Sequence, residues 1–146
     1  LENLAEIGGH FKVIASSSSS LSSLTSFSGL SGLKKIGGDF ELSATSSSYY
    51  YPLDNLSSFE GLENLEEIMG KKLTITNCEA LNNIDALSKV KALDEISITG
   101  CSELYDFCVL KNVVQNMSGT FYVNGNGYNP TKYQFLNGEC SKTSGE

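Results

Sequence analysis

The segment Leu53–Ile68 carries an apolar residue at every third position, and this period constrains the fold more than any other feature of the sequence. An α-helix turns about 100° per residue, so a strict three-residue period drifts about 60° per step and leaves no single face apolar. A 3₁₀-helix has this period but rarely persists beyond a few residues. The segment therefore predicts one coil of a stacked wall, with an inward-pointing side chain at each step: Leu53, Leu56, Phe59, Leu62, Leu65 and Ile68.

The same ladder of apolar residues recurs along the chain, starting at Leu21, Leu53, Cys78 and Cys101. Because Leu1 already lies within such a ladder, we expect this chain to be part of a longer protein. Each ladder is followed by a short alternating segment of the kind typical of a strand. One strand per repeat predicts a single parallel sheet with little or no regular α-helix, its strands near residues 11–13, 40–42, 73–75, 96–98 and 121–123.

Two early repeats contain insertions at the same corner, between the strand and the next ladder. Val13 precedes Leu21 by eight residues and Leu42 precedes Leu53 by eleven, whereas Ile75 precedes Cys78 by three. The inserted segments, 16–20 and 43–52, are rich in Ser, and the second contains Tyr49, Tyr50 and Tyr51. Insertions at one corner of a repeat protein project from one face, which is often the binding face.

Glycines precede the early strands, at Gly8-Gly9, Gly37-Gly38 and Gly70, where we expect a positive φ. At the other end the ladder stops at Asn126, which occupies the position held earlier by Leu21, Leu53, Cys78 and Cys101. Residues 1–140 are thus predicted to form one domain, with a C-terminal cap at 124–140. Residues 141–146 are predicted to be a flexible polar tail.

The composition argues against several classes of partner. A formal net charge of −7 disfavours nucleic acid, whose binding depends on cationic side chains that neutralise phosphates, and it disfavours anionic membrane surfaces. No apolar run approaches 18 residues, so no membrane insertion is expected. The sequence contains no phosphate-binding loop, dinucleotide fingerprint or metalloprotease motif, and no cofactor is expected.

The four cysteines form two pairs by position, and their spacing matches no zinc signature. Cys78 and Cys101 could form a metal pair or a disulfide between repeats. They also occupy ladder positions, where free Cys packs as a small apolar residue. We prefer this interpretation, with both thiols buried and unbonded, because neighbouring side chains that point inward in parallel suit a disulfide poorly. For Cys108 and Cys140 we favour a disulfide that joins the cap to the last ladder; two free thiols are the alternative.

The phrases LENLAEIGGHFKV, LSGLKKIGGDFEL and LENLEEIMGKKLTI resemble the receptor L domain of the leucine-rich-repeat superfamily. The resemblance covers about residues 1–123 and implies an α/β-type leucine-rich-repeat solenoid, mostly β, with right-handed coils. It also implies an exported, ligand-binding and non-catalytic protein. The sparse cysteines and short repeats favour a bacterial cell-surface protein over a receptor ectodomain.

Any catalytic triad or Cys-His site in this chain would have to use His10, the single histidine. It lies beside Lys12 on a predicted strand, where a solvated surface histidine is the simpler interpretation. We therefore expect no enzyme activity.

Two surfaces are candidates for ligand binding. The first is the outward row of the predicted sheet, one residue per strand, for which an ordinary solvated face is the preferred alternative: Lys12, Glu41, Thr74, Ser97 and Tyr122. The second is the corner with Tyr49, Tyr50 and Tyr51, whose rings suit sugar stacking or a protein interface. The alternative is that these tyrosines cover the open edge of the corner.

The sequence thus predicts a non-enzymatic recognition or adhesion module, extracellular or at the cell surface, that binds a protein or a glycan. The alternative is a structural spacer within a longer surface protein, with no ligand of its own.

The ladder is testable by substitution. Phe59→Asp or Leu62→Asp should abolish cooperative thermal unfolding followed by circular dichroism, because each buries an unpaired charge. Replacing Ser57 or Ser58, which lie between the ladder positions, should change the unfolding temperature little. Equal damage at both kinds of position would contradict the three-residue ladder.

Overall fold

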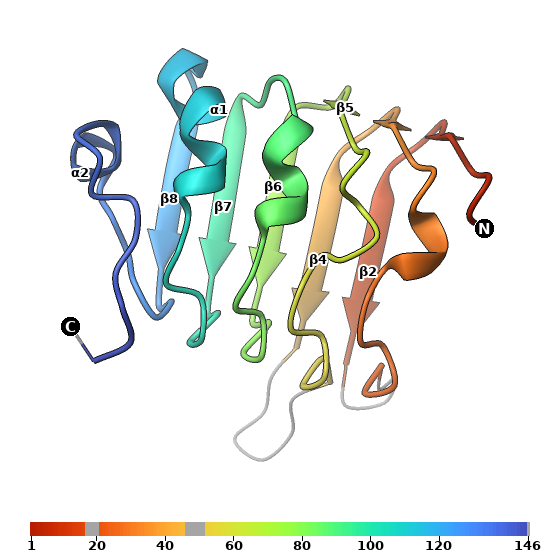
Figure 1. Cartoon of the computed structure of the whole chain (residues 1–146), viewed down its shortest axis with the longest axis horizontal. Helices are drawn as coiled ribbons and strands as arrows, with labels where there is room; N and C mark the ends of the chain where they lie inside the picture. The colour runs from red at the N-terminus through yellow and green to blue at the C-terminus, as the bar shows by residue number, and fades with distance from the viewer. Residues whose placement is uncertain (17–20, 46–51, 146) are drawn as a thin grey trace.

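A computed structural model describes residues 1–16, 21–45 and 52–145 of the chain. These residues form a small α/β protein with two parallel sheets and two short α-helices. The larger sheet has five strands, in the order β2 (Phe11–Ala15), β4 (Phe40–Ala44), β6 (Lys72–Thr76), β7 (Glu95–Thr99) and β8 (Thr120–Asn124). The smaller sheet has three, in the order β1 (Glu6–Ile7), β3 (Lys35–Ile36) and β5 (Glu67–Ile68). Figure 1 shows the strands of the larger sheet side by side in chain order.

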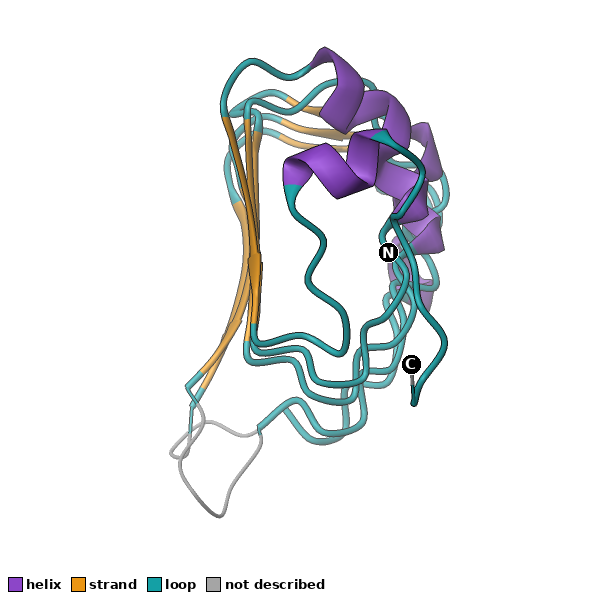
Figure 2. Cartoon of the chain, turned by 90° about the vertical axis from the view of Figure 1, so that its left-hand side faces the viewer, coloured by secondary structure: helices purple, strands orange, loops and turns teal. Residues whose placement is uncertain are grey.

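The remaining segment of each repeat runs back opposite the larger sheet, and the core lies between the two (Figure 2). Helix α1 (Lys111–Asn116) lies in this layer, together with 3₁₀ turns at Ser28–Leu30, Asp85–Lys89 and Cys108–Leu110. In the central repeat the ladder steps are closed by hydrogen bonds from residue i+3 to residue i, such as Leu62 N–H to the Phe59 carbonyl. Each step is thus a turn of the kind that brings every third side chain inward.

The ladder side chains fill the core. Leu53, Leu56, Phe59, Leu62 and Leu65 are at most 1% exposed. Rings from neighbouring repeats also touch: Phe11 contacts Phe27 and Phe40, and both of these contact Phe59. Stacked repeats of this kind bury a continuous apolar core that a single repeat could not bury alone.

The predicted fold class, a leucine-rich-repeat solenoid with one parallel sheet and little or no regular helix, is wrong. The chain has a second parallel sheet and the helices α1 and α2 (Lys132–Leu136). Strands of two residues are too short to give an alternating pattern, so β1, β3 and β5 left no periodic signal in the sequence. The helix α1 overlaps the end of a ladder, where the period of three concealed it.

The expected positive φ at the glycines before the early strands is also wrong. Among the described residues, positive φ occurs instead at other positions, including Lys71 and Asn77. Gly37 and Gly70 are required for close approach: a Cβ on Gly37 would overlap the backbone of Gly8, and one on Gly70 would overlap Asp39. Glycine at these turns therefore lets adjacent repeats pack closely.

The C-terminal end of the core is sealed. Phe135 of α2 is fully buried and its ring centroid lies 5.2 Å from that of Phe121 on β8. A disulfide joins Cys108 to Cys140, with their Cα atoms 4.9 Å apart. Ser141 then forms an antiparallel bridge with Asp106.

Asn126 is the one buried polar residue among those that the structure describes. Its Oδ1 accepts the Cys101 N–H at 3.0 Å, and its Nδ2 donates to the Ile98 carbonyl at 2.8 Å. Asn126 therefore ends the ladder by bonding to the backbone of the preceding repeat, in the position where earlier repeats place an apolar side chain.

Asn126→Ala should lower the free energy of unfolding by about 2 kcal/mol, because it removes two side-chain hydrogen bonds and leaves the Cys101 N–H without its Oδ1 acceptor. Urea unfolding followed by circular dichroism measures this change. Asn82→Ala, at an exposed asparagine, is the matched control and should change stability by less than about 0.5 kcal/mol.

Candidate binding surface

The five-stranded sheet has one face in the core and one face toward solvent, which we call the outer sheet face. Alternation along the strands places two rows of side chains across all five strands there, and a third row, Lys72, Glu95 and Thr120, across β6, β7 and β8. The first row is Lys12, Glu41, Thr74, Ser97 and Tyr122, which are paired in register across the five strands. The second row is Ile14, Ser43, Thr76, Thr99 and Asn124. No segment of the described chain covers this face (Figure 2).

Charged side chains on the outer sheet face are paired with each other. Lys12 Nζ lies 2.9 Å from Glu41 Oε2, and Lys72 Nζ lies 2.7 Å from Glu95 Oε1. The hydrogen bond from Lys72 to Glu95 also raises the pKa of the Lys72 ammonium. The face therefore carries charged groups but no local excess of either sign.

The centre of the outer sheet face is lined by hydroxyl groups. Thr74, Thr76, Ser97 and Thr99 are half-buried on the adjacent strands β6 and β7. Neighbouring strands lie about 4.8 Å apart, so these hydroxyls form a regular array in which each can donate and accept a hydrogen bond. At the two ends of the face, Tyr122 and Ile14 expose 51% and 56% of their surface.

The sequence predicted the first row of this face but not the other two. The predicted strands had three residues each, which leaves one outward position, whereas the strands of the larger sheet have five residues and two or three outward positions. The signal was present in the alternation of Thr74-Ile75-Thr76 and Ser97-Ile98-Thr99.

Tyr49, Tyr50 and Tyr51, the other predicted binding residues, lie outside the described residues.

His10 contacts Asp39 in the next repeat. Its Nδ1 accepts the Asp39 N–H at 2.9 Å and lies 3.4 Å from Asp39 Oδ2. These contacts of His10 are with a carboxylate and a backbone amide, and neither is a nucleophile.

The residues that begin each ladder are placed in the core with one exception. Leu53, Cys78 and Cys101 are at most 1% exposed, and Asn126 is 8% exposed, whereas Leu21 in the first complete ladder is half-buried. The two thiols are free, and the hydrogen bond with the Cys101 thiol, together with burial, raises the pKa of the Cys78 thiol. The raised pKa disfavours the Cys78 thiolate, the form that would react or bind a metal, whereas the same hydrogen bond lowers the pKa of the Cys101 thiol.

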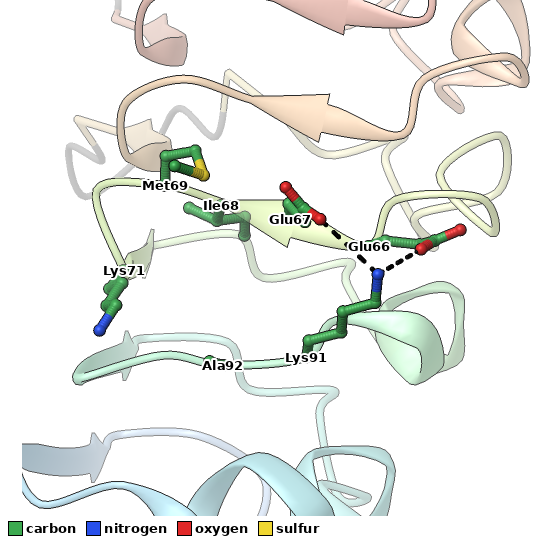
Figure 3. A pocket seen from close by; sticks show the side chains of 7 residues that line it. All are labelled: Glu66, Glu67, Ile68, Met69, Lys71, Lys91 and Ala92. Carbon is green, nitrogen blue, oxygen red and sulfur yellow. Dashed lines mark hydrogen bonds and ion pairs between the residues drawn. The ribbon is translucent and has the colours of Figure 1, made fainter.

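A small cleft lies where the three-stranded sheet ends at β5 (Figure 3). Its volume is about 230 Å³ and its lining includes Ile68, Met69 and Ala92. Lys91 Nζ reaches Glu66 Oε2 at 2.6 Å and Glu67 Oε1 at 3.6 Å, and this contact lowers the pKa of Glu66. The charges at the rim are therefore paired.

The sequence analysis missed this cleft, although the spacing contained a signal for it. Leu73 follows Ile68 by five positions, but Ile96 follows Leu93 by three. The fourth repeat is thus too short to add a strand to the smaller sheet, and the cleft opens beside β5.

The described residues offer neither a metal site nor a membrane-spanning helix. His, Cys, Asp and Glu side chains nowhere gather there in a group of three that could hold a metal ion. No helix in this part of the chain has the length and apolar character needed to cross a membrane.

Comparisons with known protein families, curated proteins and solved structures find no match to this chain.

The thiols provide a direct test of this arrangement. Iodoacetamide should add no label to the native protein, two labels after unfolding in guanidinium, and four after unfolding with a reductant. The reason is that Cys78 and Cys101 are buried and free while Cys108 and Cys140 are bonded. Intact-protein mass spectrometry counts the labels, and four labels without reductant would contradict the disulfide.

Proposed function

We propose that this protein is a non-enzymatic recognition module and that the outer sheet face binds a neutral glycan. The observation that carries the proposal is the hydroxyl array of β6 and β7 with the exposed Tyr122 ring beside it on β8. Sugars offer many hydroxyl groups of mixed donor and acceptor character, which a surface of Thr and Ser hydroxyls matches. An exposed Tyr adds a flat apolar face on which a sugar ring can stack.

The pairing of charges favours a neutral ligand over a charged one. Lys12 and Lys72 are each bonded to a carboxylate on the next strand, so neither is free to meet an anionic group. A polyanionic glycan would also meet the net charge of −7. Like-charge repulsion of this kind disfavours association.

An extended glycan would cross the strands rather than follow one of them. Equivalent side chains repeat on every strand of the larger sheet, about 4.8 Å apart, so a chain laid across the sheet meets similar groups at regular intervals. A glycan that starts on the Tyr122 ring would then pass over the hydroxyls of Ser97 and Thr74.

We also propose that the protein acts outside the cell, a location that fits this function. The Cys108–Cys140 disulfide is the kind of bond that persists in oxidising compartments. The resemblance of the ladder phrases to the receptor L domain supports the same location, and the sparse cysteines and short repeats favour a bacterial cell-surface protein.

Tyr122→Ala should weaken binding of neutral oligosaccharides by about tenfold or more, because an exposed aromatic anchor is removed from the surface. Isothermal calorimetry with cello- and manno-oligosaccharides measures the change. Tyr133→Ala is the matched control: Tyr133 is 78% exposed but lies on α2, and its loss should leave binding unchanged.

The same experiment distinguishes a structural spacer from a recognition module. If no neutral oligosaccharide binds the wild-type chain, or if Tyr122→Ala and Tyr133→Ala behave alike, the outer sheet face is not a glycan site. A spacer without a ligand would then be the better account.

A further inference from the structure

Three Asn–Gly pairs lie in the last quarter of the chain: Asn124–Gly125, Asn126–Gly127 and Asn137–Gly138. The two residues of such a pair can react with each other. The glycine nitrogen attacks the side-chain carbonyl carbon of the asparagine, and the side-chain nitrogen leaves as ammonia when the succinimide ring closes. Glycine favours this attack because it has no side chain to obstruct it. Since all three pairs have this local chemistry, the folded structure decides which of them reacts.

The pair Asn126–Gly127 is held at both of its reacting groups. The Asn126 side chain is bonded through both of its polar atoms, to the Cys101 N–H and to the Ile98 carbonyl. The Gly127 nitrogen, which would attack, donates to the Cys101 carbonyl at 3.1 Å. The Asn126 side chain is also buried, so water has little access to it. Several hydrogen bonds must therefore break before this pair can react.

The pair Asn137–Gly138 is exposed to solvent, but its reacting groups are also bonded. Asn137 follows the last residue of α2, and its Nδ2 donates to the Tyr133 carbonyl at 3.0 Å. The Gly138 N–H donates to the Phe135 carbonyl at 3.1 Å. The end of the helix thus holds both groups apart, and exposure alone does not free them.

The pair Asn124–Gly125 lacks these constraints. Asn124 is the last residue of β8, and its side chain is exposed. Within the described part of the chain, no group is hydrogen-bonded to the Asn124 side chain and none accepts the Gly125 N–H. The Asn124 carbonyl accepts the Gly100 N–H at 3.0 Å, which attaches the backbone to β7. The end of a strand can open locally at low cost in free energy, and rotation of the Asn124 backbone then brings the two reacting groups together.

We propose that Asn124 is a site of spontaneous deamidation, the pair that the fold leaves free to react. The Gly125 nitrogen bonds to Asn124 Cγ, and the side-chain nitrogen leaves as ammonia with the proton of the Gly125 N–H. Water then opens the succinimide and leaves aspartate or isoaspartate at position 124. The reaction needs no enzyme and no reactant other than water.

The product changes the outer sheet face. Asn124 lies in the second row of this face, two residues from Tyr122 and on the same side of β8. Deamidation adds a carboxylate there and makes the net charge of the chain more negative by one unit. Isoaspartate also lengthens the backbone at the end of β8, because the chain then runs through the former side chain. The reaction itself does not depend on glycan binding.

The first test compares the three pairs within one sample of the folded 146-residue chain. The chain is incubated in mildly alkaline water labelled with heavy oxygen, and peptide mapping by mass spectrometry counts the sites that take up the label. Conversion at Asn124 should be faster than at Asn126 or Asn137 by about tenfold or more, because two or more hydrogen bonds must break first at each of the other pairs. Absence of conversion at Asn124, or equal conversion at Asn126 or Asn137, overturns the proposal.

The second test repeats the incubation on the chain unfolded in guanidinium with a reductant. The three pairs then lose their tertiary contacts, and we expect them to convert at similar rates. A preference for Asn124 that persists in the unfolded chain would assign the effect to local sequence and overturn the proposal.

The third test uses Asn124→Gln, which keeps a neutral amide but makes it too long to close the five-membered ring. Isoelectric focusing of the incubated wild-type chain should show a more acidic species, and this species should be absent from Asn124→Gln. Asn137→Gln is the matched control and should still form it. Thermal unfolding first shows that both variants are folded. Folded Asn124→Gln that forms the acidic species at the wild-type rate would contradict the assignment to Asn124.

Discussion

Register between neighbouring repeats is the constraint on which the rest of this structure depends. The strands of the larger sheet pair position by position, so Leu42 meets Ile75 and Ile75 meets Ile98 in the core. A shift of one residue in any strand would move its apolar side chains to the solvent face. Side chains outside the sheet support the same alignment, since Asn64 Nδ2 donates to the Ser31 carbonyl and Asn77 Nδ2 to the Ala44 carbonyl.

The same register explains the character of the outer sheet face. Because residues of equal position lie side by side, Lys12 meets Glu41 and Lys72 meets Glu95, and the charges neutralise one another in pairs. The remaining side chains form a flat array of hydroxyl groups between Ile14 at one end of the face and Tyr122 at the other. Exposed ion pairs of this kind contribute little to stability individually, and their clearest effect is on the charge of the surface.

The two ends of the stack have different chemistry, for a reason that follows from how repeats pack. Each repeat covers one side of its neighbour, so the first and last repeats each leave an apolar side that needs another cover. At the C-terminal end, Phe135 and the Cys108–Cys140 disulfide provide it. At the N-terminal end, the described chain provides no equivalent cover, and Leu21 and Leu24 remain partly exposed.

The sequence by itself determined which side chains enter the core of this protein. A period of three and a short alternation of apolar and polar residues are local properties, so they can be recognised without knowing how the repeats are arranged. Leu53 to Leu65 and the outward row from Lys12 to Tyr122 were identified in this way. Only the tertiary structure decided how many sheets and helices exist. Strands such as β1 are two residues long and are held by pairing with distant residues, Glu6 with Lys35 and Ile7 with Ile36, which no local pattern encodes. The cleft beside Met69 likewise depends on which repeat lies next to β5, so the short spacing from Leu93 to Ile96 could be interpreted only in the folded chain.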